Sequence, residues 1–109
     1  MDTAALSAIA NDRRRRILQL VWQHELAAGE LAARFDVSWP AISQHLRVLR
    51  EAGLVRERRQ GRQRLYRADV QTLGPLAVVL EQMWREDLDR LAELAEHEQR
   101  EQDLRGDDA

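Results

Sequence analysis

The sequence predicts a mostly α-helical protein with one small β-hairpin, and three observations lead to this expectation. Apolar residues recur at three- and four-residue steps in several segments, as they do on one face of a helix. Two β-favouring segments flank Gln60-Gly61, where the glycine can take the positive φ of a tight turn. The length of 109 residues suits one domain with a modest core, so pairing with a second copy would add burial.

The composition excludes several kinds of site. The chain has no cysteine, which removes disulfides, thiolate metal sites and cysteine nucleophiles. It has no Gly-rich phosphate loop and no nucleophile beside a base, so we expect neither an enzyme nor a bound cofactor. No apolar run of about 18 residues and no signal-peptide pattern is present, so we expect a cytoplasmic protein without a membrane partner.

The charge is distributed unevenly along the chain. Residues 1–70 contain thirteen arginines and eight acidic residues, whereas residues 71–109 contain four arginines and eleven acidic residues. The formal net charge of −2 therefore hides a basic part and an acidic part. This asymmetry predicts that the first part binds a polyanion and that the second has another role.

The first two helices are expected before residue 23. Residues 4–10, AALSAIA, predict a short apolar helix, and Asn11 with Asp12 offers a cap for a second helix with apolar residues as far as Trp22. Four arginines at residues 13–16 occupy its first turns, where they oppose the helix dipole. Local stability does not explain them, so either partners within the protein or phosphates must; the sequence leaves both open.

Two further helices follow with a short connection between them. The third is expected over ELAARF, directly after Gly29, and the fourth starts at Ser38 and ends at Gly53, a residue suited to a left-handed cap. Pro40 is tolerated in the first turn, where its missing N–H has no helical partner. We therefore expect the Ser38 hydroxyl to accept a hydrogen bond from the N–H of Ala41. The spacing is typical of a helix-turn-helix.

The fourth helix is amphipathic, and an arginine-rich hairpin follows it. At about 100° per residue, one side of the helix is apolar and the other is polar. The hairpin is expected over residues 54–68, with Leu65 and Tyr66 on opposite faces and one or both anchoring it to the helices. A helix-turn-helix followed by a basic hairpin is a winged helix-turn-helix, which predicts binding to double-stranded DNA. Ser43 and Gln44 suit base edges, and the arginines of the hairpin suit the backbone.

The last segment predicts a long helix. Apolar residues from Leu73 to Leu94 recur at helical steps, and a helix of about 30 residues would span about 45 Å, more than the rest of the domain can cover. We expect one winged helix-turn-helix domain over residues 1–109, with a DNA-binding core and wing at about 1–70, a dimerisation helix at about 71–104 and a frayed tail at 105–109.

The segments NDRRRRIL and LAARFDVSWPAISQHLRVLREAGLVRERRQGRQRLYR resemble the ArsR-type bacterial transcriptional regulators. They are most similar to the metal-independent branch, whose members often read D-x-T-R-R-x-I-L and V-S-R-P-A-V-S-Q-H-L. The resemblance implies a homodimeric repressor on a palindromic operator, joined through its first and last helices. The apolar residues of these two helices give the expected interface: Leu6, Ile9, Leu76, Leu80, Met83, Trp84 and Leu91.

The resemblance also implies which residues meet DNA. Base-reading positions of the family fall on Trp39, Pro40, Ser43 and Gln44, and the counterpart of His45 lies near DNA although its angle places it on the core side. Trp39 stands where arginine is common, and both DNA and the protein itself remain open as its partner. The full predicted set is Ser38, Trp39, Pro40, Ser43, Gln44, His45, Arg47 and Arg50 in the helix, and Arg58, Arg59, Arg62 and Arg64 in the hairpin.

Many ArsR-type proteins sense metals, but neither ligand set of the family is present. The segment that carries thiolates reads ELAAGEL here, and the stretch ADVQTLGPL lacks the histidines of the alternative site. His97 with Glu93 and Glu101 is expected to be a solvated helix face. We therefore expect no metal site, and the sequence does not indicate an effector. The alternative function is a winged-helix module that binds a protein, although such a module does not need a basic helix and a basic wing together.

Overall fold

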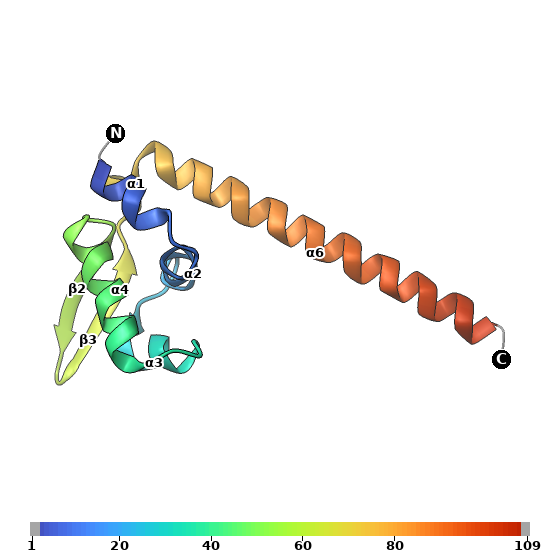
Figure 1. The fold of residues 1–109 in the computed structure, drawn as a ribbon, viewed down its shortest axis with the longest axis horizontal. Helices are drawn as coiled ribbons and strands as arrows, with labels where there is room; N and C mark the ends of the chain where they lie inside the picture. The colour runs from blue at the N-terminus through green and yellow to red at the C-terminus, as the bar shows by residue number, and fades with distance from the viewer. Residues whose placement is uncertain (1–2, 108–109) are drawn as a thin grey trace. The chain divides into compact units, whose positions relative to one another are not determined.

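The computed structural model describes residues 3–107, which divide into two compact units with the boundary along the chain between Gly74 and Pro75. The first unit contains α1 (Thr3–Ile9), α2 (Asp12–Leu20), β1 (Leu26–Ala27), α3 (Ala28–Ala33), α4 (Trp39–Glu51), β2 (Val55–Gln60), β3 (Gln63–Ala68) and α5 (Val70–Leu73) (Figure 1). The second unit is the single helix α6 (Pro75–Asp107). The expected domain of helices with one hairpin is confirmed for the first unit.

The sheet of the first unit has three antiparallel strands in the order β1-β3-β2. Strands β2 and β3 form the expected hairpin, called the wing below, with Gly61 at a φ of 62° in its turn. Leu65 and Tyr66 are both buried, so both anchor the wing. The short strand β1 pairs Leu26 with Tyr66 and was not predicted, because two residues are too few to show a period.

The arginine run at the start of α2 is largely explained by contacts within the first unit. Arg14 donates from Nε to the carbonyl oxygen of Ala8 at 2.7 Å and from Nη2 to that of Ser7 at 3.3 Å. Arg15 donates to the carbonyl oxygen of Ile9 at 2.7 Å and also pairs with Asp12. The last carbonyls of a helix have no partner within it, so these side chains satisfy the end of α1. The guanidinium of Arg16 lies over the ring of Phe35.

The two helices of the helix-turn-helix are α3 and α4. The expected start of the third helix after Gly29 is wrong: α3 begins at Ala28, where β1 ends and the Glu30 carboxylate accepts the N–H of Ala27 at 3.1 Å. It also ends at Ala33, two residues earlier than expected. The predicted cap of α4 is confirmed, because the Ser38 hydroxyl accepts the N–H of Ala41 at 3.3 Å.

One side of α4 belongs to the core of the first unit. Ile42, Leu46 and Leu49 are buried, and α4 packs on α2, α3 and β2. Figure 1 shows α4 running beside the wing. The helix ends at Glu51, with Gly53 at a φ of 77° just beyond it, as expected.

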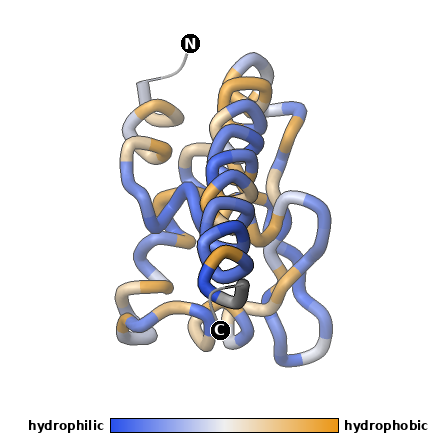
Figure 2. Tube along the Cα trace, turned by 90° about the vertical axis from the view of Figure 1, so that its right-hand side faces the viewer, coloured by the Kyte–Doolittle hydropathy of each residue, from blue (hydrophilic) through white to orange (hydrophobic). Residues whose placement is uncertain are grey.

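Helix α6 differs from the expected last helix at both ends. Leu73 belongs to the separate helix α5, so α6 begins at Pro75. It continues to Asp107, past the expected end at 104; residues 108–109 of the expected frayed tail lie outside the described residues. Orange bands recur between blue turns along α6 in Figure 2, and Leu88, Leu91 and Leu94 are 63%, 62% and 59% exposed. None of the helices described is long and apolar enough to cross a membrane.

We predict opposite effects for alanine at two glycines of the first unit. Gly53→Ala should lower the free energy of unfolding by about 1–2 kcal/mol, because its positive φ is unfavourable for a residue with a Cβ. Gly29→Ala is the control: it lies within α3, an added Cβ meets nothing within 4 Å, and it should stabilise by about 0.5–1 kcal/mol. Urea denaturation measures both, and equal effects would contradict this account of Gly53.

Candidate nucleic-acid interface

The polar side of α4 is exposed along its whole length. Trp39, Pro40, Ser43, Gln44, Arg47 and Arg50 are all exposed, as is the cap residue Ser38. This exposure follows from the sequence, because burial of Ile42, Leu46 and Leu49 turns the intervening residues away from the core. Ser43 and Gln44 lie in the first half of the helix and the two arginines in the second. The short hydrogen-bonding side chains and the cations therefore share one exposed side.

The strand register divides the arginines of the wing between two faces. Partners across an antiparallel pair share a face, and successive residues alternate. Arg59 is paired with Arg64, and Glu57 with Tyr66, so these four side chains lie on one face. Arg58 is paired with Leu65 and lies on the other face, with Arg56 and Arg67. The wing arginines expected to act together are thus not all on the same side.

Arg58 is held on that second face by Glu25. Its Nε and Nη2 donate to the two carboxylate oxygens of Glu25 at 2.6 and 2.8 Å. These hydrogen bonds lower the pKa of the Glu25 carboxyl and raise the pKa of Arg58. A two-pronged pair of this kind fixes the direction of the guanidinium. Arg58 therefore points away from the face that carries Arg59 and Arg64.

Arg59 and Arg64 stand directly opposite each other on the first face. Like charges in this arrangement destabilise a sheet, so the fold itself gains nothing from the pair. Arg64 lies 3.5 Å from Glu57, whose other carboxylate oxygen accepts from Arg50 of α4 at 2.7 Å. Glu57 was not among the expected site residues, although it is an isolated acid in a run of arginines.

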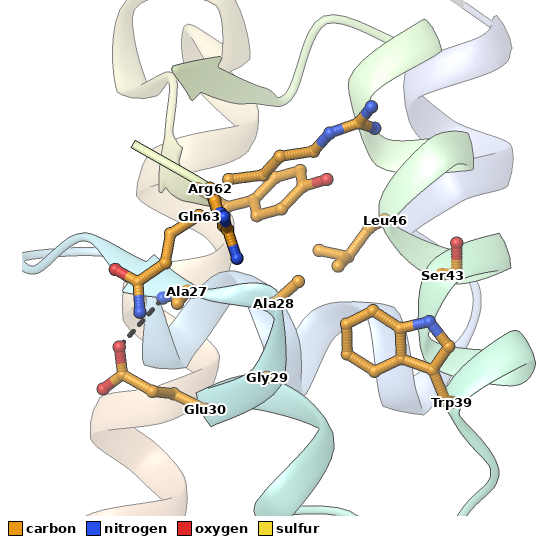
Figure 3. Close-up of a pocket in the computed structure, with 11 residues that line it drawn as sticks. Ala27, Ala28, Gly29, Glu30, Trp39, Ser43, Leu46, Arg62 and Gln63 are labelled. Atoms are coloured by element: carbon orange, nitrogen blue, oxygen red, sulfur yellow. Dashed lines mark hydrogen bonds between the residues drawn. The ribbon is translucent and has the colours of Figure 1, made fainter. Parts of the chain in front are cut away.

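A groove of about 660 Å³ lies between the start of α3, the exposed side of α4 and the tip of the wing (Figure 3). In Figure 3 the ring of Trp39 forms one wall and the side chain of Arg62 reaches in from the wing. Trp39 is 53% exposed. The groove is lined by Ala27, Ala28, Gly29, Glu30, Trp39, Ser43, Leu46, Arg62, Gln63, Arg64 and Tyr66.

The groove brings together predicted residues from both elements, and it adds some that were missed. Trp39 and Ser43 from α4 share it with Arg62 and Arg64 from the wing, whereas Arg47 lines no part of it and lies 3.9 Å from Glu51. The contributions of β1 and α3 could not be read from the sequence, because Ala27, Ala28 and Gly29 carry no functional side chain.

His45 lies between α4 and α2, apart from the exposed side of α4. Its Nδ1 is 3.5 Å from Nη1 of Arg14, and a guanidinium can only donate, so the imidazole accepts there as a neutral ring. Burial, together with the charges of Arg14 and Arg13, lowers the pKa of His45. His97 lies on α6, 3.1 Å from Glu101. Residues 3–107 contain no group of three or more His, Asp or Glu side chains placed to hold a metal ion.

The fold and the site define a winged helix-turn-helix protein in which α4 exposes a polar side and the wing is basic. A family-wide sequence profile, described as "Bacterial regulatory protein, arsR family", matches residues 11–57. The chain is 40% identical over 94 residues to HTH-type transcriptional regulator Rv2034 from Mycobacterium tuberculosis, and the match covers 86% of this chain and 88% of the relative. The chain therefore belongs to the arsR family of bacterial regulatory proteins.

Solved structures agree with this assignment. The crystal structure of a possible transcriptional regulator for arsenical resistance has a TM-score of 0.65 and 46% identity, covering 84% of this chain and 95% of that chain. The solution structure of a homodimeric winged helix-turn-helix DNA-binding domain, Mb0332 from Mycobacterium bovis, has a TM-score of 0.66 and 30% identity, covering 76% and 77%.

We predict that His45 makes the protein less stable in acid. Its pKa is lower in the folded state than in the unfolded state, where it is about 6.5. Its contribution to stability is therefore complete above about pH 6.5 and declines as the pH falls below that value. Urea denaturation at pH 7.5 and pH 5.5 should show a smaller decrease for His45→Gln than for the wild type. Equal decreases for the two proteins would contradict this prediction.

Proposed function

We propose that this chain is a homodimeric, sequence-specific regulator of transcription that represses by binding a palindromic operator in the bacterial cytoplasm. The observation that carries the proposal is the shared groove, where the exposed side of α4 and the cationic face of the wing lie together. A groove-reading helix alone covers few base pairs, and a twofold pair of such helices is more selective. Repression is proposed because similar proteins are named as repressors, such as transcriptional repressor SdpR of Bacillus subtilis, 39% identical over 54 residues.

Ser43 and Gln44 are proposed to read base edges in the major groove, with Gln44 suited to adenine. Trp39 is proposed to pack on a sugar or a thymine methyl, because its ring is half exposed and faces the groove that Arg62 enters. Arg47, Arg50, Arg59, Arg62 and Arg64 are proposed to meet phosphates. Ser38 and Pro40 set the start of α4 at the surface. We leave Arg58 out of the contact set because it lies on the opposite face of the wing, where Glu25 holds it, and His45 because it faces Arg14 away from the exposed side of α4.

We also propose that the protein is not an enzyme and responds to no metal. The absence of cysteine removes the thiolate chemistry that softer metals prefer. The His97–Glu101 pair is largely exposed on α6 and supplies two ligands, fewer than a tight site needs. An effector of another chemical class is compatible with these features.

Operator selection from random duplexes tests the function, and point variants then test the surface. Gln44→Ala should weaken the selected operator by roughly 1–3 kcal/mol per half-site and leave random DNA almost unchanged, because only matched bases lose a partner. Arg62→Ala should weaken both DNAs and make the log–log salt slope shallower by about one unit for each phosphate that the variant no longer neutralises.

Arg58→Ala is the matched control, since it removes a wing arginine from the opposite face. It should change neither the affinity nor the slope. Failure to select any sequence would favour a protein-binding module instead. Equal weakening on both DNAs for Gln44→Ala would remove that residue from the base-reading set.

The dimer is proposed to form through α6 and α1. On α6 the leucines at 88, 91 and 94 make an exposed apolar stripe, and Leu6 of α1 is also exposed. Of the other expected interface residues, Met83 is exposed, Ile9 and Trp84 are half-buried, and Leu76 and Leu80 are buried. The proposal therefore centres on the middle of α6, where uncovered leucines are most frequent.

We predict that Leu91→Asp converts the dimer to a monomer, because pairing would bury a carboxylate without a partner. Gln82→Asp places the same charge about 180° around the helix and should leave the dimer intact. Sedimentation at micromolar concentration, with circular dichroism to check folding, distinguishes the two. A wild-type monomer, or a Leu91→Asp dimer as tight as the wild type, would reject this interface.

A further inference from the structure

Glu57 joins the wing to the end of α4 through two cations. Its Oε2 accepts from Nη1 of Arg50 at 2.7 Å, and its Oε1 lies 3.5 Å from Nε of Arg64. The Glu57 side chain is only 17% exposed, whereas the two arginine side chains are 43% and 49% exposed. One carboxylate therefore lies mostly covered between two guanidiniums that remain accessible from outside.

Fold stability does not account for this arrangement. Partly exposed ion pairs add little to stability, and the wing is already anchored by Leu65 and Tyr66. A carboxylate on the face that carries Arg59 and Arg64 also repels phosphates, which weakens binding to every duplex. The arrangement does fix the distance between two cations. It holds Arg50 of α4 and Arg64 of the wing on the two carboxylate oxygens of Glu57.

We propose that Glu57 is a positioning residue for DNA selectivity, which holds Arg50 and Arg64 in a set geometry and reduces binding to unmatched DNA. This inference rests on the proposed function, because it presupposes that both elements meet DNA. A duplex whose backbone fits the held geometry binds without rearrangement of the pair. A duplex whose backbone does not fit must either lose a phosphate contact or pull an arginine away from Glu57.

Glu57→Gln tests the proposal because it keeps the shape and removes the charge. Binding to random duplex DNA should tighten by roughly twofold to fivefold, the range expected for a partly exposed ion pair. The log–log salt slope should steepen by about one unit for each arginine released to a phosphate. Affinity for the selected operator should rise less or fall, so the ratio of operator to random binding should decrease.

Glu25→Gln is the matched control, since it also removes one acid that pairs with a wing arginine, but on the opposite face. It should leave the ratio and the slope unchanged. An unchanged ratio for Glu57→Gln, with a selective wild type, would overturn the inference and leave the proposed function standing. A wild type that selects no sequence would overturn both.

Glu57→Asp provides a second measurement that does not depend on the first variant folding. It keeps the charge but shortens the side chain by one methylene, so it cannot reach both arginines as Glu57 does. Random-DNA affinity should rise less than in Glu57→Gln, because the negative charge is kept, and the ratio of operator to random binding should again decrease. A Glu57→Asp variant with the wild-type ratio would show that the length of this side chain does not matter and would overturn the inference.

Discussion

Burial of Ile42, Leu46 and Leu49 is the constraint on which the rest of the first unit depends. These side chains fix the rotation of α4 about its axis, and that rotation decides which residues face outward. The caps then fix its length: Ser38 begins the helix in front of Pro40, and Gly53 reverses the chain into β2. Because the wing starts two residues after Gly53, the position of α4 also sets the position of the hairpin beside it.

In this protein the positions of the charged side chains matter more for binding than the net charge of the chain. The first unit is rich in arginine, but several of these side chains are occupied within the fold: Arg14 and Arg15 at the end of α1, and Arg58 on Glu25. Arg59 and Arg62 have no ion pair among residues 3–107. The cations available to a partner are thus fewer than the composition indicates, and one of them, Arg62, lines the groove.

Much of the fold could be predicted from the sequence because its signals are local. The cap of α4, the turn at Gly61 and the amphipathic pattern of α4 each depend on a few adjacent residues, and the structure confirms them. Strand β1 and the start of α3 could not be predicted, since two or three small residues have no period and their structure depends on pairing with β3.

The arrangement of the candidate site could be predicted only in part. The exposed side of α4 follows from helical angles, but the wing arginines could be sorted only with the strand register, which is a property of the hairpin as built. The sequence alone does not show that Arg58 and Arg59 have different surroundings. The role of Glu57 likewise depends on Arg50 being near it across the fold, seven residues earlier in the chain.

The hydrogen bonds of the Arg14 guanidinium limit which residues can replace Arg14 in α2. It reaches the carbonyls of Ala8 and Ser7 from two different nitrogens, and α1 is a helix of only seven residues, too short to be stable by itself. A lysine would keep the charge but has a single nitrogen at the end of a flexible chain. Exchange of arginine for lysine, usually regarded as conservative, would here loosen the first helix of the protein while leaving its net charge the same.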